Sequence, residues 1–327
     1  MRILRNHIAA GLVLLAAATT SWAEYPDKPI TLIVPFAAGG PSDKIARDLA
    51  EALRKPLGGQ MVIVENAGGA GGTIGSTKVA RAKPDGYTLL VHHIGMATAP
   101  TLYRNLPYKV PEDFEMLGII NEAPSVLIGK TSLPVNNFAE LREWIAKNGK
   151  NVTLANAGIG SSSHLCGLLL QNALKVSVTP VPYKGTGPAM TDLMGGQVDL
   201  MCEQATNATP QIDGKKVKVY GVTSLQRVQT PTLKNVPTLS ESGLKDFNVQ
   251  TWHALYAPKG TPPAILEKLG AALRAALQDP ELIKREEALG LTVVKDDRLQ
   301  PGVHKKFLES EKERYGKVIK DAGEYAE

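Results

Sequence analysis

The hydrophobic positions of this chain alternate between two spacings. Short apolar runs rich in β-branched residues, of which Ile30-Thr31-Leu32-Ile33-Val34 is the first, are typical of buried strands. Between these runs lie longer segments with apolar residues three or four positions apart, as Ile45, Leu49 and Leu53 are after the helix-capping residue Ser42. Further strands are expected at 61–64, 87–91, 125–128, 152–155, 178–182, 198–201, 217–222 and 249–256. Further helices are expected up to 79, from 137, at 164–174 and 188–194, after 263 and at 301–322. Strands separated by helix-length segments predict a parallel, doubly wound α/β sheet.

Two parts of the chain share one layout. Residues 30–53 and 152–174 each read as a strand, a loop of glycine and other small residues, and a helix. The total length of 327 residues is also more than one compact domain usually contains. We therefore expect two similar α/β domains.

The first 23 residues have the pattern of a signal peptide. Arg2 and Arg5 precede an apolar segment at 8–18, and Ser21-Trp22-Ala23 offers small residues for cleavage before Glu24. A membrane anchor is the alternative, but the apolar segment is short. A lipid anchor is not expected, because no cysteine lies near the cleavage site. The sequence thus predicts export to the periplasm as a soluble protein.

Composition and charge exclude several classes of protein. With 43% hydrophobic and 21% charged residues, the chain can build a core and is not a disordered polymer. Outside the N-terminus it has no apolar stretch long enough for a membrane protein with several spans. The net charge of +5 falls to +3 once Arg2 and Arg5 are removed, and the basic residues cluster only at 215–218. No nucleic-acid partner is expected.

The two cysteines, Cys166 and Cys202, are a disulfide candidate in an exported protein. Two buried free thiols are the alternative interpretation. Cys166 falls in the first turn of a predicted helix and Cys202 at the end of a predicted strand. A bridge between them would hold the loop that precedes the helix, and we predict that it forms.

Two loops are candidates for binding an anion. Residues 36–42 and 158–163 each lie between the end of a predicted strand and the start of a helix, where backbone amides are unpaired and ligands of open α/β sheets bind. Ser42, Ser161 and Ser162 add hydroxyl groups. Simple connecting turns are the alternative for either loop alone, but two such loops facing one cleft favour an anion.

Familiar catalytic and nucleotide motifs fail on inspection. Gly129-Lys130-Thr131 resembles the end of a phosphate-binding loop, but Pro124 stands where its first glycine is needed. No serine has the flanking glycines of a nucleophile elbow, and no histidine, cysteine or carboxylate cluster has metal-ligand spacing. We therefore expect no cofactor and no enzymatic activity, and a carboxylate is a more natural anion than a nucleotide.

An ordered set of short motifs resembles a known family. The motifs are Tyr25-Pro26-Asp27-Lys28-Pro29-Ile30, Val34-Pro35-Phe36-Ala37-Ala38-Gly39-Gly40, Val64-Glu65-Asn66, Lys83-Pro84-Asp85-Gly86-Tyr87, Val181-Pro182-Tyr183-Lys184-Gly185, Gly195-Gly196-Gln197-Val198-Asp199-Leu200-Met201, Val236-Pro237-Thr238 and Ala257-Pro258-Lys259-Gly260-Thr261-Pro262. Together they resemble the Bug family, the periplasmic receptors of tripartite tricarboxylate transporters.

The resemblance implies a two-domain periplasmic-binding-protein fold, type II-like, that closes on a small carboxylate. Domain 1 would comprise 24–124 plus 255–327 and domain 2 would comprise 125–254, with hinge strands near 125–128 and 249–256. The implied partners are a small carboxylate and the membrane permease subunits of a tripartite transporter, with the receptor itself a monomer.

The resemblance also implies a ligand site at the two loops, 36–42 and 158–164. The expected ligand-binding residues are Phe36, Ala38, Gly39, Ser42, His93, Gly158, Ser161, Ser162, His164, Glu203 and Thr206. His92-His93 and Cys202-Glu203 depart from the usual family pattern, so the ligand does not carry over. The histidines either donate hydrogen bonds to a second polar end of the ligand or serve the fold. Glu203 either orients a histidine, binds a ligand amine or hydroxyl, or lies on the rim.

The leading functional hypothesis is a receptor for a dicarboxylate, aliphatic or aromatic, with a monocarboxylate that has a polar tail left open. A sensory ligand carrier for a receptor kinase is a second hypothesis. A third is an exported hydrolase that uses Ser161, Ser162 or Cys166 with His164, although no acid follows to orient this histidine.

Overall fold

The computed structural model describes residues 25–323, so the predicted signal peptide lies outside the described residues. Its main feature is a mixed sheet with the strand order β2-β1-β3-β9-β4-β7-β5-β6, with β8 and β10 paired to β4. The strands are β1 (Ile30–Val34), β2 (Val62–Asn66), β3 (Thr88–His93), β4 (Phe114–Gly129), β5 (Thr153–Asn156), β6 (Thr179–Pro182), β7 (Leu200–Gln204), β8 (Lys218–Val222), β9 (Gln250–Pro258) and β10 (Thr292–Val293). The helices are α1 (Pro41–Arg54), α2 (Thr73–Ala80), α3 (Gly95–Leu102), α4 (Phe138–Asn148), α5 (Ser162–Leu174), α6 (Thr186–Met194), α7 (Ala205–Asp213), α8 (Pro263–Ala276), α9 (Pro280–Ala288) and α10 (Pro301–Ala322).

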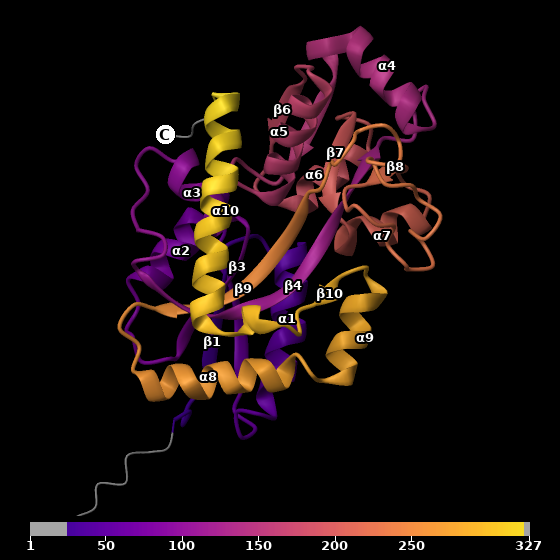
Figure 1. Cartoon of the computed structure of the whole chain (residues 1–327). Coiled ribbons are helices and arrows are strands. Elements are labelled where there is room, and N and C mark those ends of the chain that lie inside the picture. Colours follow the sequence, from indigo (N-terminus) through magenta and orange to yellow (C-terminus); the bar gives the residue numbers. More distant parts are fainter. Residues whose placement is uncertain (1–24, 324–327) are drawn as a thin grey trace, which may run out of the picture.

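Two lobes lie at the two ends of this sheet (Figure 1). The first lobe contains the parallel strands β2-β1-β3 with β9 and the first part of β4, covered by α1 to α3 and α8 to α10. The second lobe contains the parallel strands β7-β5-β6 with β8 and the end of β4, covered by α4 to α7. One large buried apolar cluster fills the first lobe, with a small second one between α3 and α10, and two clusters fill the second lobe. Each lobe therefore has a core of its own.

Two long strands, β4 and β9, connect the lobes. β4 pairs with β9 up to Pro124, and from Ser125 onward it pairs with β7 and β8. β9 begins at Gln250 opposite Pro124. Both strands are visible as long ribbons that run from the lower part of the molecule to the upper lobe in Figure 1.

The expectation of a wholly parallel sheet was wrong. β9 runs antiparallel to both β3 and β4, and β4 runs antiparallel to β7 and β8. Hydrophobic spacing predicts that a strand forms but says nothing of its direction, which the connection between strands determines. The parallel expectation holds only for the three outer strands of each lobe.

Most predicted elements exist, and the errors have local causes. Residues 114–124 were not predicted as strand, because Gly118 (φ 153°) and two register shifts interrupt their alternation. Helices α3 and α7 were missed because each contains an internal proline, Pro100 and Pro210, and two threonines of low helix propensity. The predicted cap of α4 is confirmed: Asn137 Oδ1 accepts from the Glu140 amide at 2.9 Å.

The predicted disulfide between Cys166 and Cys202 is confirmed. It links the N-terminal part of α5 to β7, and the two Cα atoms are 6.1 Å apart. Both residues are buried in the core of the second lobe. The start of α5 is thereby fixed on the sheet. Within residues 25–323, none of the helices is long and apolar enough to cross a membrane.

Candidate ligand-binding site

A small cavity of about 20 Å³ lies where the loop after β1 meets the loop after β5. A volume of this size accommodates about one water molecule. The ends of β3, β6 and β7 complete its walls. The lining residues are Phe36, Ala37, Gly40, Pro41, Ser42, His93, Ala157, Ser161, Ser162, Gly185, Thr186 and Gln204. The two loops that the sequence predicted to face one cleft therefore share a cavity.

A wider cavity of about 430 Å³ forms the mouth of the site, and the lobes touch across it. Its walls include the glycine-rich segment 69–72 and Tyr103 from the first lobe, and Gly158, Ile159 and Gly185 from the second. The Tyr103 hydroxyl donates to the Ile159 carbonyl at 2.7 Å. The site is thus closed over by direct contacts between the lobes.

Several amides that the sequence suggested for anion binding are already used within their own loops. Gly39 N–H donates to Asp43 Oδ2 at 2.9 Å, and Gly158 N–H donates to Asn156 Oδ1 at 3.0 Å. Gly160 N–H bonds His164 Nδ1 at 3.4 Å. These bonds make the loops rigid. Hydroxyl groups are left to bind an anion, together with those first-turn amides of α1 and α5 that have no partner within their own loop.

The cavity presents hydroxyl groups from both lobes. Ser42 Oγ lies 3.3 Å from His253 Nε2 in the first lobe. In the second lobe, Ser161 Oγ accepts from the His164 amide and so caps α5. Ser162 Oγ accepts from Gln204 Nε2 at 3.2 Å, which leaves the Ser162 proton free to donate into the cavity.

His93 supplies a neutral donor to the same cavity. Its Nδ1 accepts from the Gly95 amide at 2.9 Å, so its proton is on Nε2. Burial lowers the pKa of His93 to about 3, which keeps the ring uncharged at neutral pH. The Phe36 ring stacks on it with the centroids 4.4 Å apart. His93 can therefore orient a carboxylate oxygen without adding a charge.

The other predicted site residues do not line this cavity. Ala38 and Gly39 are exposed, and Gly158 belongs to the mouth. Glu203 is buried beneath the cavity wall, where its Oε2 lies 3.3 Å from Thr186 Oγ1 and burial raises its pKa to about 8. His164 and Thr206 are buried in α5 and α7 and are not among the lining residues.

Sequence reasoning missed the contribution of the turn after β6 and of Gln204. Gly185 (φ 123°) lets the chain enter α6 with Thr186 facing the cavity. This strand–glycine–helix pattern is the same signal that identified the other two loops, so it could have been found. Gln204 follows Glu203 at the end of β7, and only the fold places its amide beside Ser162.

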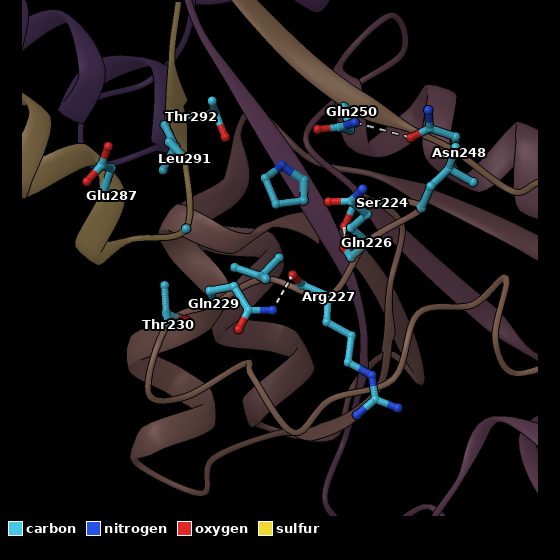
Figure 2. Close-up of a pocket in the computed structure, with 14 residues that line it drawn as sticks. Ser224, Gln226, Arg227, Gln229, Thr230, Asn248, Gln250, Glu287, Leu291 and Thr292 are labelled. Atoms are coloured by element: carbon cyan, nitrogen blue, oxygen red, sulfur yellow. Dashed lines mark hydrogen bonds between the residues drawn. The ribbon is translucent and has the colours of Figure 1, made fainter.

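A larger cavity of about 610 Å³ lies elsewhere, beside the strands that connect the lobes. Figure 2 shows Glu287, Leu291 and Thr292 on one side of it, and Gln229 and Thr230 on the other. It contains neither of the two small-residue loops, and half of its lining residues carry amides or hydroxyls, with Arg227 and Glu287 as its charged members. Within residues 25–323, no group of three or more histidine, cysteine or acidic side chains is placed to hold a metal ion.

Comparisons with known proteins agree with this fold. A curated relative, the UPF0065 protein in the TAR-I ttuE-ttuC' intergenic region of Agrobacterium vitis, is 49% identical over 95% of this chain and 90% of its own length. The solved structure of the periplasmic binding protein BugD is 49% identical, with a TM-score of 0.88 over 93% of this chain and all of BugD.

Two of the similar solved structures are described with a ligand. MatC from Rhodopseudomonas palustris with bound malate is 38% identical (TM-score 0.85, covering 90% of this chain and all of MatC). An R. palustris protein with adipate is 29% identical (TM-score 0.86, covering 92% and 99%). Residues 45–324 match the model described as the tripartite tricarboxylate transporter family receptor. The chain has the α/β periplasmic-binding-protein fold and belongs to this family, the Bug family of periplasmic solute-binding receptors.

Proposed function

We propose that this protein captures a small dicarboxylate between its two lobes and delivers it to the membrane subunits of a tripartite tricarboxylate transporter. The observation that carries the proposal is the shared cavity, where Ser42 and His93 of the first lobe face Ser161 and Ser162 of the second. Among the described residues that line it, none is lysine or arginine. Neutral donors and helix N-termini suit a carboxylate that must also be released.

The relatives support the dicarboxylate assignment. Malate is bound to MatC, and adipate to the second R. palustris protein. Both molecules have a carboxylate at each end. In this protein one end would meet the hydroxyls of the inner cavity, and the mouth cavity offers room for the other.

Binding would proceed by closure of the two lobes. The proposed bodies are 24–124 plus 255–327 and 125–254, except that residues 251–254 pair with β3 and the first part of β4 and so move with the first body. The proposed hinge lies where β4 and β9 pass between the lobes, at Pro124 and Gln250. The inner cavity holds about one water. The lobes must therefore separate to admit a dicarboxylate, and closure then removes water from it. We propose that residues 1–23 direct export and that the receptor acts as a monomer.

A thermal-shift screen tests the function. L-malate, succinate and adipate are expected to raise the melting temperature, because a ligand that binds only the folded protein stabilises it, by about 2.7 kcal/mol at 100 times its Kd. Glucose and choline at the same ionic strength serve as controls. A response to the controls with none to any mono-, di- or tricarboxylate would contradict the proposal.

Tyr103→Phe is expected to raise the Kd for whichever dicarboxylate binds by about 3- to 10-fold, which corresponds to the loss of one neutral hydrogen bond. The Tyr103 hydroxyl bonds the opposite lobe at Ile159, so its removal affects only the closed arrangement. Tyr220→Phe is the matched control, because its hydroxyl bonds the Val135 carbonyl within one lobe. Equal Kd values for both variants, measured by calorimetry, would exclude this role for Tyr103.

A further inference from the structure

A line of buried polar side chains runs from the cavity to α9. Ser42 Oγ lies 3.3 Å from His253 Nε2, and His253 Nδ1 lies 2.9 Å from Asn121 Oδ1. Asn121 Nδ2 in turn donates to the Glu286 carboxylate. All four side chains are at most 4% exposed. They belong to α1, β9, β4 and α9, so the line passes through both strands that connect the lobes.

An ionised Glu286 fixes the direction of every hydrogen bond in this line, because a carboxylate can only accept. Asn121 must then turn its NH₂ group to Glu286 and its Oδ1 to His253. His253 donates from Nδ1, and its Nε2 is left as an acceptor for the Ser42 proton. Ser42 therefore faces the cavity with oxygen lone pairs, which repel a ligand carboxylate.

A protonated Glu286 permits the opposite direction. Its O–H donates to Asn121 Oδ1 after the amide rotates by half a turn, and the Asn121 NH₂ donates to His253 Nδ1. His253 then donates from Nε2 to Ser42 Oγ, and the Ser42 proton is free to bond a carboxylate oxygen. The net change is one proton taken up from solvent by Glu286, while the imidazole stays neutral and moves its proton from Nδ1 to Nε2 by solvent exchange.

We propose that Glu286 acts through Asn121 and His253 to set whether Ser42 donates to or repels a carboxylate, so that the ligand binds more tightly when Glu286 is protonated. The inference rests on the proposed function and adds to it a positioning residue that does not line the cavity.

The surroundings of Glu286 place its titration near neutral pH. The pKa of Glu286 is raised to about 7: burial raises it most, the hydrogen bond from Asn121 lowers it, nearby Asp48 raises it and Lys44 lowers it. Arg285, the adjacent basic residue of α9, bonds Asp48 at 3.4 Å. The β10 strand that packs on α9 has no titratable side chain. The pKa of His253 is well below its usual value, because of burial and then the nearby His93, so its ring stays uncharged over this range.

The test is the Kd for L-malate, measured by calorimetry at pH 6 and pH 8, where both malate carboxyls are ionised. One linked proton makes the wild-type Kd about tenfold higher at pH 8, because Glu286 loses its proton as the pH rises through 7. Glu286→Gln removes the titration, so the ratio of the two Kd values is expected to fall about tenfold. Glu287→Gln, which removes a neighbouring exposed charge, should leave the ratio as in the wild type. The pKa of Glu203 is about 8, so this residue can also contribute to the pH dependence of the Kd. Its contribution is the same in the wild type and both variants, and it cancels when their Kd ratios are compared.

A ligand-free measurement separates this inference from the proposed function. ¹⁵N NMR of the His253 ring is expected to show the proton on Nδ1 at pH 8 and on Nε2 at pH 6 in the wild type, with no such change in Glu286→Gln. An unchanged His253 tautomer, or an equal Kd ratio in Glu286→Gln and Glu287→Gln, would overturn the inference although malate binds. Failure of malate and every other carboxylate to bind at either pH would instead overturn the proposed function.

Discussion

Replacement of both cysteines, Cys166→Ala with Cys202→Ala, is expected to lower the free energy of unfolding by about 3–4 kcal/mol. The bridge spans 36 residues of the chain, and its removal gives the unfolded state the freedom of that loop. Alanine is chosen because both cysteines are 1% exposed, so that a serine hydroxyl would be buried without a partner. The double variant should still fold, since the three large apolar clusters remain in the described part of the chain.

Urea unfolding of the wild type and the double variant, each with and without dithiothreitol, measures this effect. The reductant should destabilise the wild type by about the same 3–4 kcal/mol and leave the double variant unchanged. A wild type that is indifferent to dithiothreitol, with equal urea midpoints for the two proteins, would mean that the cysteines are not bridged in the purified protein.

The bridge also matters for the site. Ser162 and Cys166 lie one turn apart on α5, and Gln204 and Cys202 lie two residues apart on β7. The disulfide and the hydrogen bond between Gln204 and Ser162 therefore join the same two elements, α5 and β7. A disulfide at this point holds one wall of the cavity in place during the proposed closure.

The local elements, and the two loops that line one cavity, could be predicted from the sequence. The run 30–34 and the helix with Ile45, Leu49 and Leu53 follow from spacing alone, and the loop between them is where α/β folds bind ligands. The predicted cap of this helix was wrong: α1 begins at Pro41 with Gly40 as its N-cap, and Ser42 lies inside its first turn without capping it. The same argument predicted the loop after β5, and the predicted export favoured a bridge between the two cysteines.

The features of the fold and the site that the sequence did not predict depend on contacts between distant parts of the chain. Asn121 and Glu286 are 165 positions apart, and Ser42 and His253 are 211 apart, so no local pattern could join them. The occupied Gly39 amide was missed because a glycine-rich loop looks the same in sequence whether its amides are free or bonded. The antiparallel direction of β9 likewise follows from the path of the chain and leaves no trace in its apolar spacing.

The contact between the glycine-rich segment and the second lobe predicts the largest effect on binding. Gly71→Ala is expected to raise the Kd for a bound dicarboxylate by about 100-fold, because overpacking that cannot relax costs up to about 3 kcal/mol. A Cβ at Gly71 would come under 3.0 Å from the Ile159 carbonyl and the Tyr103 hydroxyl, closer than real Cβ atoms approach. The carbonyl belongs to the backbone of the opposite lobe and cannot rotate away, so the lobes could close only partly.

Gly58→Ala separates this clash from backbone strain. Gly58 has a similar positive φ of 71°, against 60° for Gly71, but a Cβ there has no atom within 4 Å. Both variants should therefore lose similar stability, by about 1 kcal/mol, whereas only Gly71→Ala should lose affinity. Calorimetric titration with malate and thermal unfolding of the same samples provide the two measurements. If Gly71→Ala bound as tightly as Gly58→Ala, the lobes would not need to meet at Ile159 when the ligand is held, and closure could not be the mechanism of capture.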